Sequence, residues 1–450
     1  MRLGGVAFVA LAMVSAGCVA GLAAEDPARE LEGQTTEERQ DPVFSDPIVV
    51  DDERDLTEPA VEVDSEGRVY VAGIPGVTGS VSDGQEDTTG ASQIFGSLDG
   101  GQSFELIDPL PSGLYGASFG GGDVDLALGS ADEVYMTDLW AGNAGFVASG
   151  DHGETWPTST PAIFTFPGID RQWIDTHADT GAIYVSAQSL STGAVREVAN
   201  TDSNLVLAKS EDGGETFSVE RPIGTEERNL ISPSGPLVVN EARDEIAIPY
   251  STSSGGQGVA VSVTPDEGDT WEHTSIPGID EQTTVFPVIA DDNAGNLYLV
   301  TTLDDRIVLS TSGDGGRTWT TPEVVDPDPG EEQIIPWVVA GDAGELAVSW
   351  REASTEGDPQ RWDYELATIT NGLSSDPSVT VHQLNDEPID EGDYSLREVN
   401  ELAIGPDGAV HAAWPSLPAD GEDTVTQYAR QIDGAPLAGD GSVEGFAPSP

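Results

Sequence analysis

The sequence predicts an all-β protein built from repeats of a four-stranded antiparallel sheet. Short apolar runs alternate with turns rich in Gly, Asp and Asn through most of the chain, which is typical of strands joined by tight turns. The 53 glycines and 30 prolines among 450 residues also favour turns over long helices. One eight-residue turn pattern recurs five times, so the strands belong to a repeated unit.

The clearest copy of the unit covers residues 286–325. Its four strands are expected at 287–290, 296–300, 306–310 and 318–325, with polar turns between them. A sheet of this kind has two apolar faces and is not stable by itself. Radial stacking against neighbouring sheets buries both faces, so the repeat predicts the blades of a β-propeller.

The turn between the third and fourth strands has the pattern Ser/Thr-x-Asp-x-Gly-x-Thr/Ser-Trp/Phe. Its copies are separated by 48 to 61 residues and begin at Ser97, Ser149, Ser210, Thr264 and Ser312. This pattern is the Asp box, and the chain resembles the BNR, or sialidase-like, β-propellers. Within each turn the carboxylate accepts backbone N–H bonds and the aromatic residue anchors the turn, so we assign these aspartates a structural role. They are Asp99, Asp151, Asp212, Asp266 and Asp314.

The second strand of the unit gives a more frequent signal, a short apolar run after a polar turn. Seven such runs are centred on Tyr70, Tyr135, Tyr184, Ala247, Tyr298, Ala347 and His411. We therefore predict seven four-stranded blades, the last two without an Asp box. Six blades are the alternative if the sixth or seventh repeat is not a blade.

The N-terminus has the features of an export signal. Arg2 precedes an apolar run over residues 3–14, so residues 1–24 are predicted to be a signal peptide. Cys18 is the only cysteine and follows small residues at the end of that run, which excludes an internal disulfide and resembles a lipoprotein signal. We expect an exported protein that is lipid-anchored at the cell surface through Cys18, or extracellular after ordinary cleavage.

Residues 25–57 have the acidic, proline-containing composition of a tether. The apolar run at 47–51 is the exception, and we expect it to be the outermost strand of the seventh blade, paired with residues 424–432. The propeller is expected over 58–435, followed by a flexible tail over 436–450.

The large negative charge of the chain indicates the salt concentration to which the protein is adapted. With 81 acidic and 17 basic residues the net charge is −64, and such self-repulsion is tolerable where concentrated salt screens it. The sequence therefore indicates a salt-adapted, halophilic protein. Nucleic acid is excluded as a partner because no basic patch is present to replace the counterions of phosphates.

The resemblance makes a sialidase-like glycoside hydrolase the enzymatic alternative. It implies three arginines gripping a carboxylate, a Tyr–Glu pair and an acid/base Asp. The sequence departs from this pattern at Gly73-Ile74-Pro75, where the first arginine of the family is replaced by glycine, and only Tyr394-Ser395 is similar to the nucleophile segment. We therefore predict no catalytic residues, and the scattered histidines and acidic clusters predict no metal site or cofactor.

A binding or scaffold module with a glycan or peptide ligand is the preferred function. Ligands of propellers bind where loops leave the second strand and enter the first, and aromatic and arginine side chains fall there in several repeats. The alternative for these aromatic residues is that they fill the space between blades. The candidate ligand-binding residues are Asp138, Trp140, Arg171, Tyr250, Trp350, Arg351, Tyr394, Arg397 and Trp414.

Overall fold

A computed structural model of the chain describes one unit that begins at Gln40. The described residues are 40–74, 92–107, 122–140, 142–164, 168–190, 205–220, 231–252, 258–280, 283, 285–354, 360–391, 399–417, 424–439 and 441–443. The predicted signal peptide, Cys18 and the tether up to residue 39 lie outside these ranges. Within the described ranges, no helix is long and apolar enough to span a bilayer.

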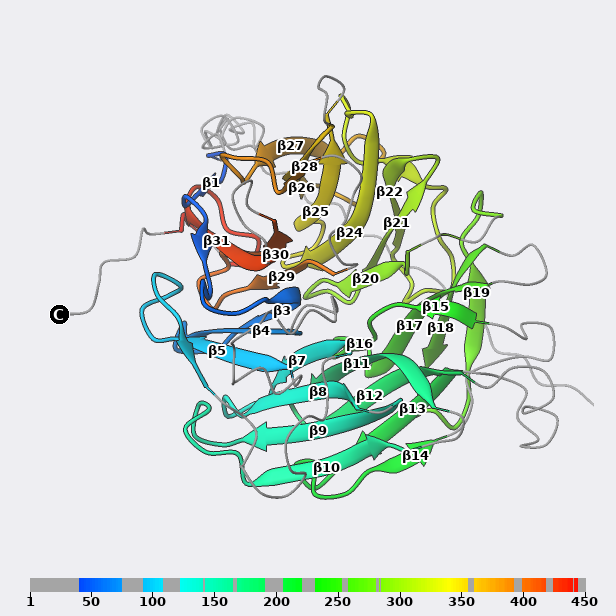
Figure 1. The fold of residues 1–450 in the computed structure, drawn as a ribbon. Helices are drawn as coiled ribbons and strands as arrows, with labels where there is room; N and C mark the ends of the chain where they lie inside the picture. The colour runs from blue at the N-terminus through cyan, green and yellow to red at the C-terminus, as the bar shows by residue number, and fades with distance from the viewer. Residues whose placement is uncertain are drawn as a thin grey trace, which may run out of the picture. The chain divides into compact units, whose positions relative to one another are not determined.

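Seven small antiparallel sheets form a seven-bladed β-propeller, as the repeats predict (Figure 1). Each blade is a meander in which consecutive strands pair, and a few blades have an additional short strand. Blade 1 has β3 (Thr57–Val63), β4 (Val69–Ile74), β5 (Gln93–Ser97) and β6 (Glu105–Leu106). Blade 2 has β7 (Val124–Leu128), β8 (Val134–Trp140), β9 (Asn143–Ser149) and β10 (Thr158–Ile163), and blade 3 has β11 (Ile169–His177), β12 (Ala182–Ser189), β13 (Leu205–Ser210) and β14 (Ser218–Glu220). Blade 4 has β15 (Ile231–Ser234), β16 (Val238–Asn240), β17 (Glu245–Thr252), β18 (Val259–Thr264) and β19 (Glu272–Ser275).

Blade 5 has β20 (Val288–Asp291), β21 (Leu297–Leu303), β22 (Arg306–Ser312) and β23 (Glu323–Val324); blade 6 has β24 (Glu332–Ala340), β25 (Leu346–Ala353), β26 (Arg361–Thr370), β27 (Ser378–Gln383) and β28 (Asp390–Glu391); blade 7 has β29 (Glu401–Ile404), β30 (Val410–Ser416), β31 (Val425–Asp433), β1 (Val43–Phe44) and β2 (Ile48–Val49). The first strand of each blade contacts the first strands of its neighbours, so these strands surround the axis and the fourth strands form the rim.

The antiparallel order gives each blade two ends with different roles. The turns after the first and third strands lie at one end, which we call the Asp-box end. The first strands begin, and the second strands finish, at the other end, which we call the entry end. Hydrogen bonds between neighbouring blades confirm the first grouping, because Arg243 in a first turn donates to the carbonyl of Gly313 in the next blade's Asp box, 2.9 Å away.

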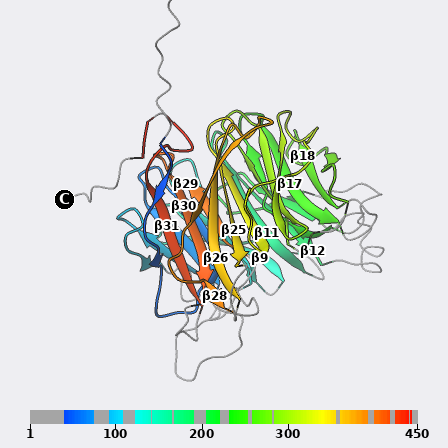
Figure 2. The ribbon, with the colours of Figure 1, turned by 90° about the horizontal axis from the view of Figure 1, so that it is seen from above.

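Two N-terminal strands complete blade 7. Both β1 and β2 pair antiparallel with β31, and the two views show this N-terminal segment beside β31 (Figures 1 and 2). Between them Ser45 N–H donates to Arg430 O, and after β2 Val50 N–H donates to Thr426 O. The pairing of residues 48–49 is the one expected for the closing strand. The sequence analysis missed β1, which is separated from β2 because Pro47 has no N–H for the ladder.

The segment after β31 packs on blades 6 and 7. Leu437 is buried in the main apolar cluster, its N–H donates to Gly408 O, and its carbonyl accepts from Asp342 N–H at 2.7 Å. Gly439 N–H donates to the Asp342 carboxylate at 2.9 Å. Described residues beyond 435 therefore belong to the propeller, and the boundary expected there falls too early.

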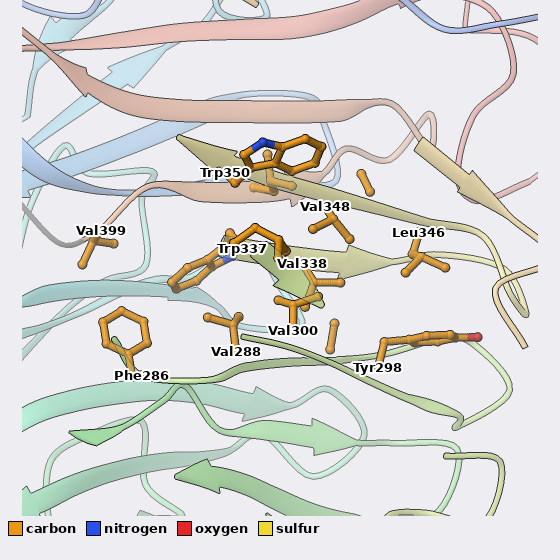
Figure 3. Close-up of a cluster of buried hydrophobic side chains, with 14 of the residues drawn as sticks. Phe286, Val288, Tyr298, Val300, Trp337, Val338, Leu346, Val348, Trp350 and Val399 are labelled. Atoms are coloured by element: carbon orange, nitrogen blue, oxygen red, sulfur yellow. The ribbon is translucent and has the colours of Figure 1, made fainter. Parts of the chain in front are cut away.

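Apolar side chains fill the spaces between blades. The largest cluster runs through blades 3 to 7 and includes aromatic residues from several first and second strands. Figure 3 shows Phe286, Trp337, Val399 and Trp350 in this cluster, with Val288 and Val300 beside them. Each blade contributes side chains to the seams on both of its faces, which is why the repeats fold only as a ring.

The Asp boxes stabilise their own turns. In blade 5 the Asp314 carboxylate accepts from the Ser312 hydroxyl at 2.9 Å and from the hydroxyl and amide of Thr318 at 2.7 and 2.8 Å. Trp319 Nε1 donates to Gly316 O at 3.0 Å, which fixes the ring against the turn.

The second glycine of a box also packs against the preceding blade. Gly101 has a φ of +88°, and a Cβ there would lie 2.2 Å from the ring of Tyr428 in blade 7. Gly214 has a φ of +84°, and its Cβ would lie 1.9 Å from the ring of Phe146 in blade 2. Only glycine satisfies both the conformation and the close approach.

Candidate functional site

At the Asp-box end, the aspartates of the Asp boxes are hydrogen-bonded within their own turns. In blade 2 the hydroxyl and amide of Thr155 hold the pKa of Asp151 below its usual range, since both donate to the ionised carboxylate. The equivalent aspartates Asp212 and Asp266 have the same bonds from Thr216 and Thr270. These carboxylates are already hydrogen-bonded within their own turns, which agrees with a structural role.

At the entry end, backbone strain occurs within the first strands themselves. Four first strands, β3, β11, β15 and β24, have a register shift against their second strands near this end. In three of the bulges a non-glycine residue has a positive φ: Glu58 at 50°, Arg171 at 56° and Ile335 at 55°. A β-branched residue such as Ile335 is rarely found in this region, and each such residue costs about 1 to 3 kcal/mol.

An aromatic cluster crosses the axis just below these bulges. Trp173 of blade 3 lies 5.0 Å from Phe286 and 5.9 Å from Trp337 of blade 6, measured between ring centroids. Blades 3 and 6 are not neighbours, so the Trp173–Trp337 contact joins opposite sides of the ring. The guanidinium of Arg171 lies 5.3 Å from the centroid of Phe286, in cation–π contact. Arg171 thus covers the entry side of the cluster.

Five carboxyl groups on first strands form a second layer around the axis, which we call the carboxyl layer: Glu62, Asp125, Asp175, Asp291 and Glu401. Burial raises the pKa of Glu62 to about 8, and the charges of Asp175 and Asp125 add to the rise. Burial likewise raises the pKa of Asp291 to about 8, that of Asp125 to about 8 and that of Asp175 to about 6. The pKa of Glu401 is also raised, chiefly by burial.

Two members of the carboxyl layer tie neighbouring blades together. Asp125 of blade 2 accepts from Ile174 N–H of blade 3 at 2.8 Å, and Asp175 of blade 3 accepts from Val239 N–H of blade 4 at 2.7 Å. These bonds stabilise the charged forms, while burial and mutual repulsion oppose them. The carboxyl layer therefore joins blades through hydrogen bonds, and ionisation of its carboxyl groups destabilises the folded state.

The chain matches a sequence-family model described as a BNR repeat-like domain over residues 175–349. That match covers blades 3 to 5 with three of the five Asp boxes and extends into blade 6. Residues 175–349 of this seven-bladed β-propeller are thus similar to a BNR repeat-like domain. No curated protein sequence matches it significantly.

Solved structures similar to this propeller differ widely from it in sequence. A leech intramolecular trans-sialidase is 12% identical, with a TM-score of 0.49 over 86% of this chain and 91% of that one. The NanB sialidase of Streptococcus pneumoniae is 11% identical, with a TM-score of 0.48 over 87% and 94%. An ulvan lyase is 12% identical, with a TM-score of 0.47 over 87% and 95%. These similarities concern the fold alone.

Three aromatic candidates lie two or three residues before the ends of second strands, and their rings are covered. Tyr250 is 1% exposed, and Trp350 and Trp414 are fully buried. The Trp414 ring stacks on Tyr364 at 4.5 Å with an interplanar angle of 14°. In this structure the three rings fill the seams between blades and present no stacking face to a ligand.

The arginine candidates have different environments. Arg351 is fully buried, and its Nη2 donates to Val399 O at 2.6 Å. Arg171 is half-buried at the entry end, where its own N–H donates to Asp123 Oδ2 at 3.0 Å. Asp138 is half-buried at the same end of blade 2.

The other candidates give no further information on the site. The side chain of Trp140 and the whole of Tyr394 and Arg397 lie outside the described residues. Among the residues that are described, no group of three or more His, Cys, Asp or Glu side chains is arranged to hold a metal ion. Of the candidate residues, Arg171 and Asp138 are those that lie at the entry end with described, partly accessible side chains.

The carboxyl layer predicts a pH dependence of stability. The folded state binds these protons more tightly than the unfolded state, so the free energy of unfolding falls as the pH rises from about 4 through about 8. Surface carboxylates are already ionised above pH 6, and the melting temperature should therefore drop by several degrees between pH 6 and pH 9. The substitution Asp291→Asn should reduce this drop, and the exposed Asp376→Asn should not. A drop that is the same in all three proteins would contradict the role of the layer.

Proposed function

We propose that this propeller is a binding or scaffold module whose ligand, a glycan or a peptide, binds at the entry end of the axis. The observation that supports it is the strain in the first strands at Glu58, Arg171 and Ile335, all at one end. Strained backbone persists where surrounding structure holds it, and it is concentrated at ligand sites. At the Asp-box end the non-glycine residues with positive φ lie in turns and not in strands: Asp132, His152, Asp244, Glu267 and Asn371.

The side chains at the entry end agree with a binding role. Arg171 offers a guanidinium that is only half-buried, and it lies over an aromatic ring that fixes its position. The carboxylate of Asp123 on blade 2 accepts the backbone N–H of Arg171, and Asp138 is paired with Val124, the residue after Asp123. Mixed polar groups above an apolar base are what saccharides and peptides bind.

A sialidase-like hydrolase is the second candidate, and the described residues give it less support. On the described first and second strands the arginines are Arg171 and Arg351, and Arg351 is buried on a backbone carbonyl. Gly73, the position of the family's first arginine, packs against Leu56, where a Cβ would lie 2.6 Å from that side chain. A three-arginine grip is not formed by these residues.

The proposal includes a location, which rests on the sequence. The signal-like N-terminus and Cys18 would export the protein and attach it to a membrane by a lipid. A module tethered in this way would hold its ligand at the cell surface.

Two assays on the purified protein in molar salt test the proposal together. A glycan and peptide array should show saturable binding, and a fluorogenic sialoside should give no release above background. Turnover that disappears on Tyr394→Phe would establish the hydrolase instead. An array without any saturable ligand would contradict the binding module.

A further inference from the structure

The segment that follows β31 lies between the first turns of blades 6 and 7, at the Asp-box end. We call residues 435–439 of this segment the strap. The first turn of blade 6 follows β24, and the first turn of blade 7 follows β29. Asp342 N–H of the former donates to Leu437 O at 2.7 Å, and Leu437 N–H donates to Gly408 O of the latter at 2.8 Å. One residue of the strap thus bonds to both turns through its backbone.

Blades 4 and 5, and blades 5 and 6, are joined directly at their first turns. Arg243 Nε of blade 4 donates to Gly295 O of blade 5 at 2.7 Å. Asn293 N–H of blade 5 donates to Gly341 O of blade 6 at 2.8 Å. Between blades 6 and 7 the strap lies at the corresponding place and has a bond to each side. It is therefore held as a peptide ligand would be, between two walls that belong to different blades.

Both walls approach the backbone of the strap closely. A Cβ on Gly341 would lie 2.3 Å from Leu437 O, and a Cβ on Gly408 would lie 2.0 Å from Ala438 O. Glycine is the residue found where another segment comes this close to the backbone. The two glycines leave room for one extended backbone between the turns.

The remaining contacts of the strap involve few side chains. Leu437 is 3% exposed and belongs to the main apolar cluster. The Asp342 carboxylate accepts from Gly439 N–H at 2.9 Å, and Gln431 Nε2 donates to Ala435 O at 2.8 Å. The strap thus contributes backbone groups and one buried apolar side chain. Any extended segment with the same groups at the same spacing has the same contacts available.

We propose that the Asp-box end of the seam between blades 6 and 7 is a peptide-binding slot, which in this structure is occupied by the strap. The slot accepts an extended, uncharged segment in which a leucine lies between small residues, as in Ala435-Pro436-Leu437-Ala438-Gly439. The proline favours binding because it restricts the backbone beforehand. Such a segment of a partner protein would compete with the strap. The slot lies opposite the proposed ligand end, and the inference does not depend on that proposal.

Exchange of the strap for a free peptide tests the slot, with the full chain in molar salt. Leu437→Asp puts a charge into the apolar cluster and should release the strap from the slot. A fluorescent peptide with the sequence of residues 434–443 should then bind saturably to the Leu437→Asp protein. We expect its affinity for the wild-type protein to be at least about tenfold weaker, because the covalently attached strap competes at a high effective concentration.

Two controls identify the contacts that bind the peptide. The same peptide with aspartate in place of its leucine should not bind. Gly341→Ala, added to Leu437→Asp, should weaken binding by at least about tenfold, because the new Cβ would lie where the peptide carbonyl lies. Gly150→Ala is the matched substitution, since a Cβ there would meet no described atom within 4 Å. It should leave the affinity of the peptide unchanged.

Hydrogen exchange gives a second readout that does not require Leu437→Asp to fold. In the Gly341→Ala single variant the amide of Leu437 should lose protection, and in Gly150→Ala it should keep the protection of the wild type. A folded Leu437→Asp protein that does not bind the peptide would overturn the proposal. So would a peptide affinity that Gly341→Ala does not change, or a Leu437 amide that stays protected in that variant.

Discussion

A chain truncated through Asp52 should melt roughly 5 °C or more below one truncated through Arg39. The longer truncation removes β1 and β2 and thus exposes the outer edge of β31. It also removes Val50, which is buried, and the contact between Phe44 and His382, whose ring centroids are 5.3 Å apart. A buried apolar side chain contributes about 1.5 to 3 kcal/mol, so several are lost together.

The shorter truncation is the matched control. It ends before Gln40, whose carbonyl accepts from Ala435 N–H, so every described contact of the closing segment is kept. Its melting temperature should equal that of the full chain. Equal melting temperatures for both truncated proteins would contradict a ring closed by residues 43–50.

Transfer from molar to millimolar salt should lower the melting temperature strongly, by an amount that no single substitution matches. The chain has 81 acidic and 17 basic residues, so repulsion exceeds the attraction of its ion pairs. Pairs such as Lys209 with Glu267, at 2.6 Å, gain strength in low salt, and they are too few to offset the repulsion. At 1 M salt the Debye length is about 3 Å, which screens most carboxylate pairs.

The control for this prediction replaces salt with sucrose at an equal osmotic strength. Sucrose favours the compact state by exclusion and does not screen charge. We expect sucrose to recover only a minor part of the stability lost. Melting curves that coincide in molar and millimolar salt would show that the charge does not act on the folded state.

The repeats predicted the fold because their signals are local. An Asp box specifies its own turn through Asp314 and its equivalents, and the apolar run before it specifies a strand. Seven copies of the second strand then fix the number of blades. The closing strand could be predicted because residues 47–51 are apolar within an acidic segment. The packing of Leu437 could not, because one leucine in a Gly/Pro-rich segment gives no periodic signal.

Less of the candidate site than of the fold could be predicted from the sequence. Spacing along a strand gives the level of Trp350 or Trp414, and both do lie at the entry end. It does not say whether the ring points into a seam or toward solvent, since that depends on the neighbouring blade. The carboxyl layer was missed because acidic residues are everywhere in this chain. Its only local signal is an acid between apolar residues, as in Val61-Glu62-Val63 and Val124-Asp125-Leu126.

The affinity of Arg171→Ala for the ligand found on the array tests the proposed site most directly. Arg243→Ala is its control, because Arg243 is also half-buried but lies at the Asp-box end, where it bonds to Gly295 O and Gly313 O. We predict that Arg171→Ala weakens binding by about tenfold or more, since hydrogen bonds to a charged group are lost, and that Arg243→Ala binds like wild type. Unchanged affinity for Arg171→Ala, or an equal loss in both variants, would contradict binding at the entry end.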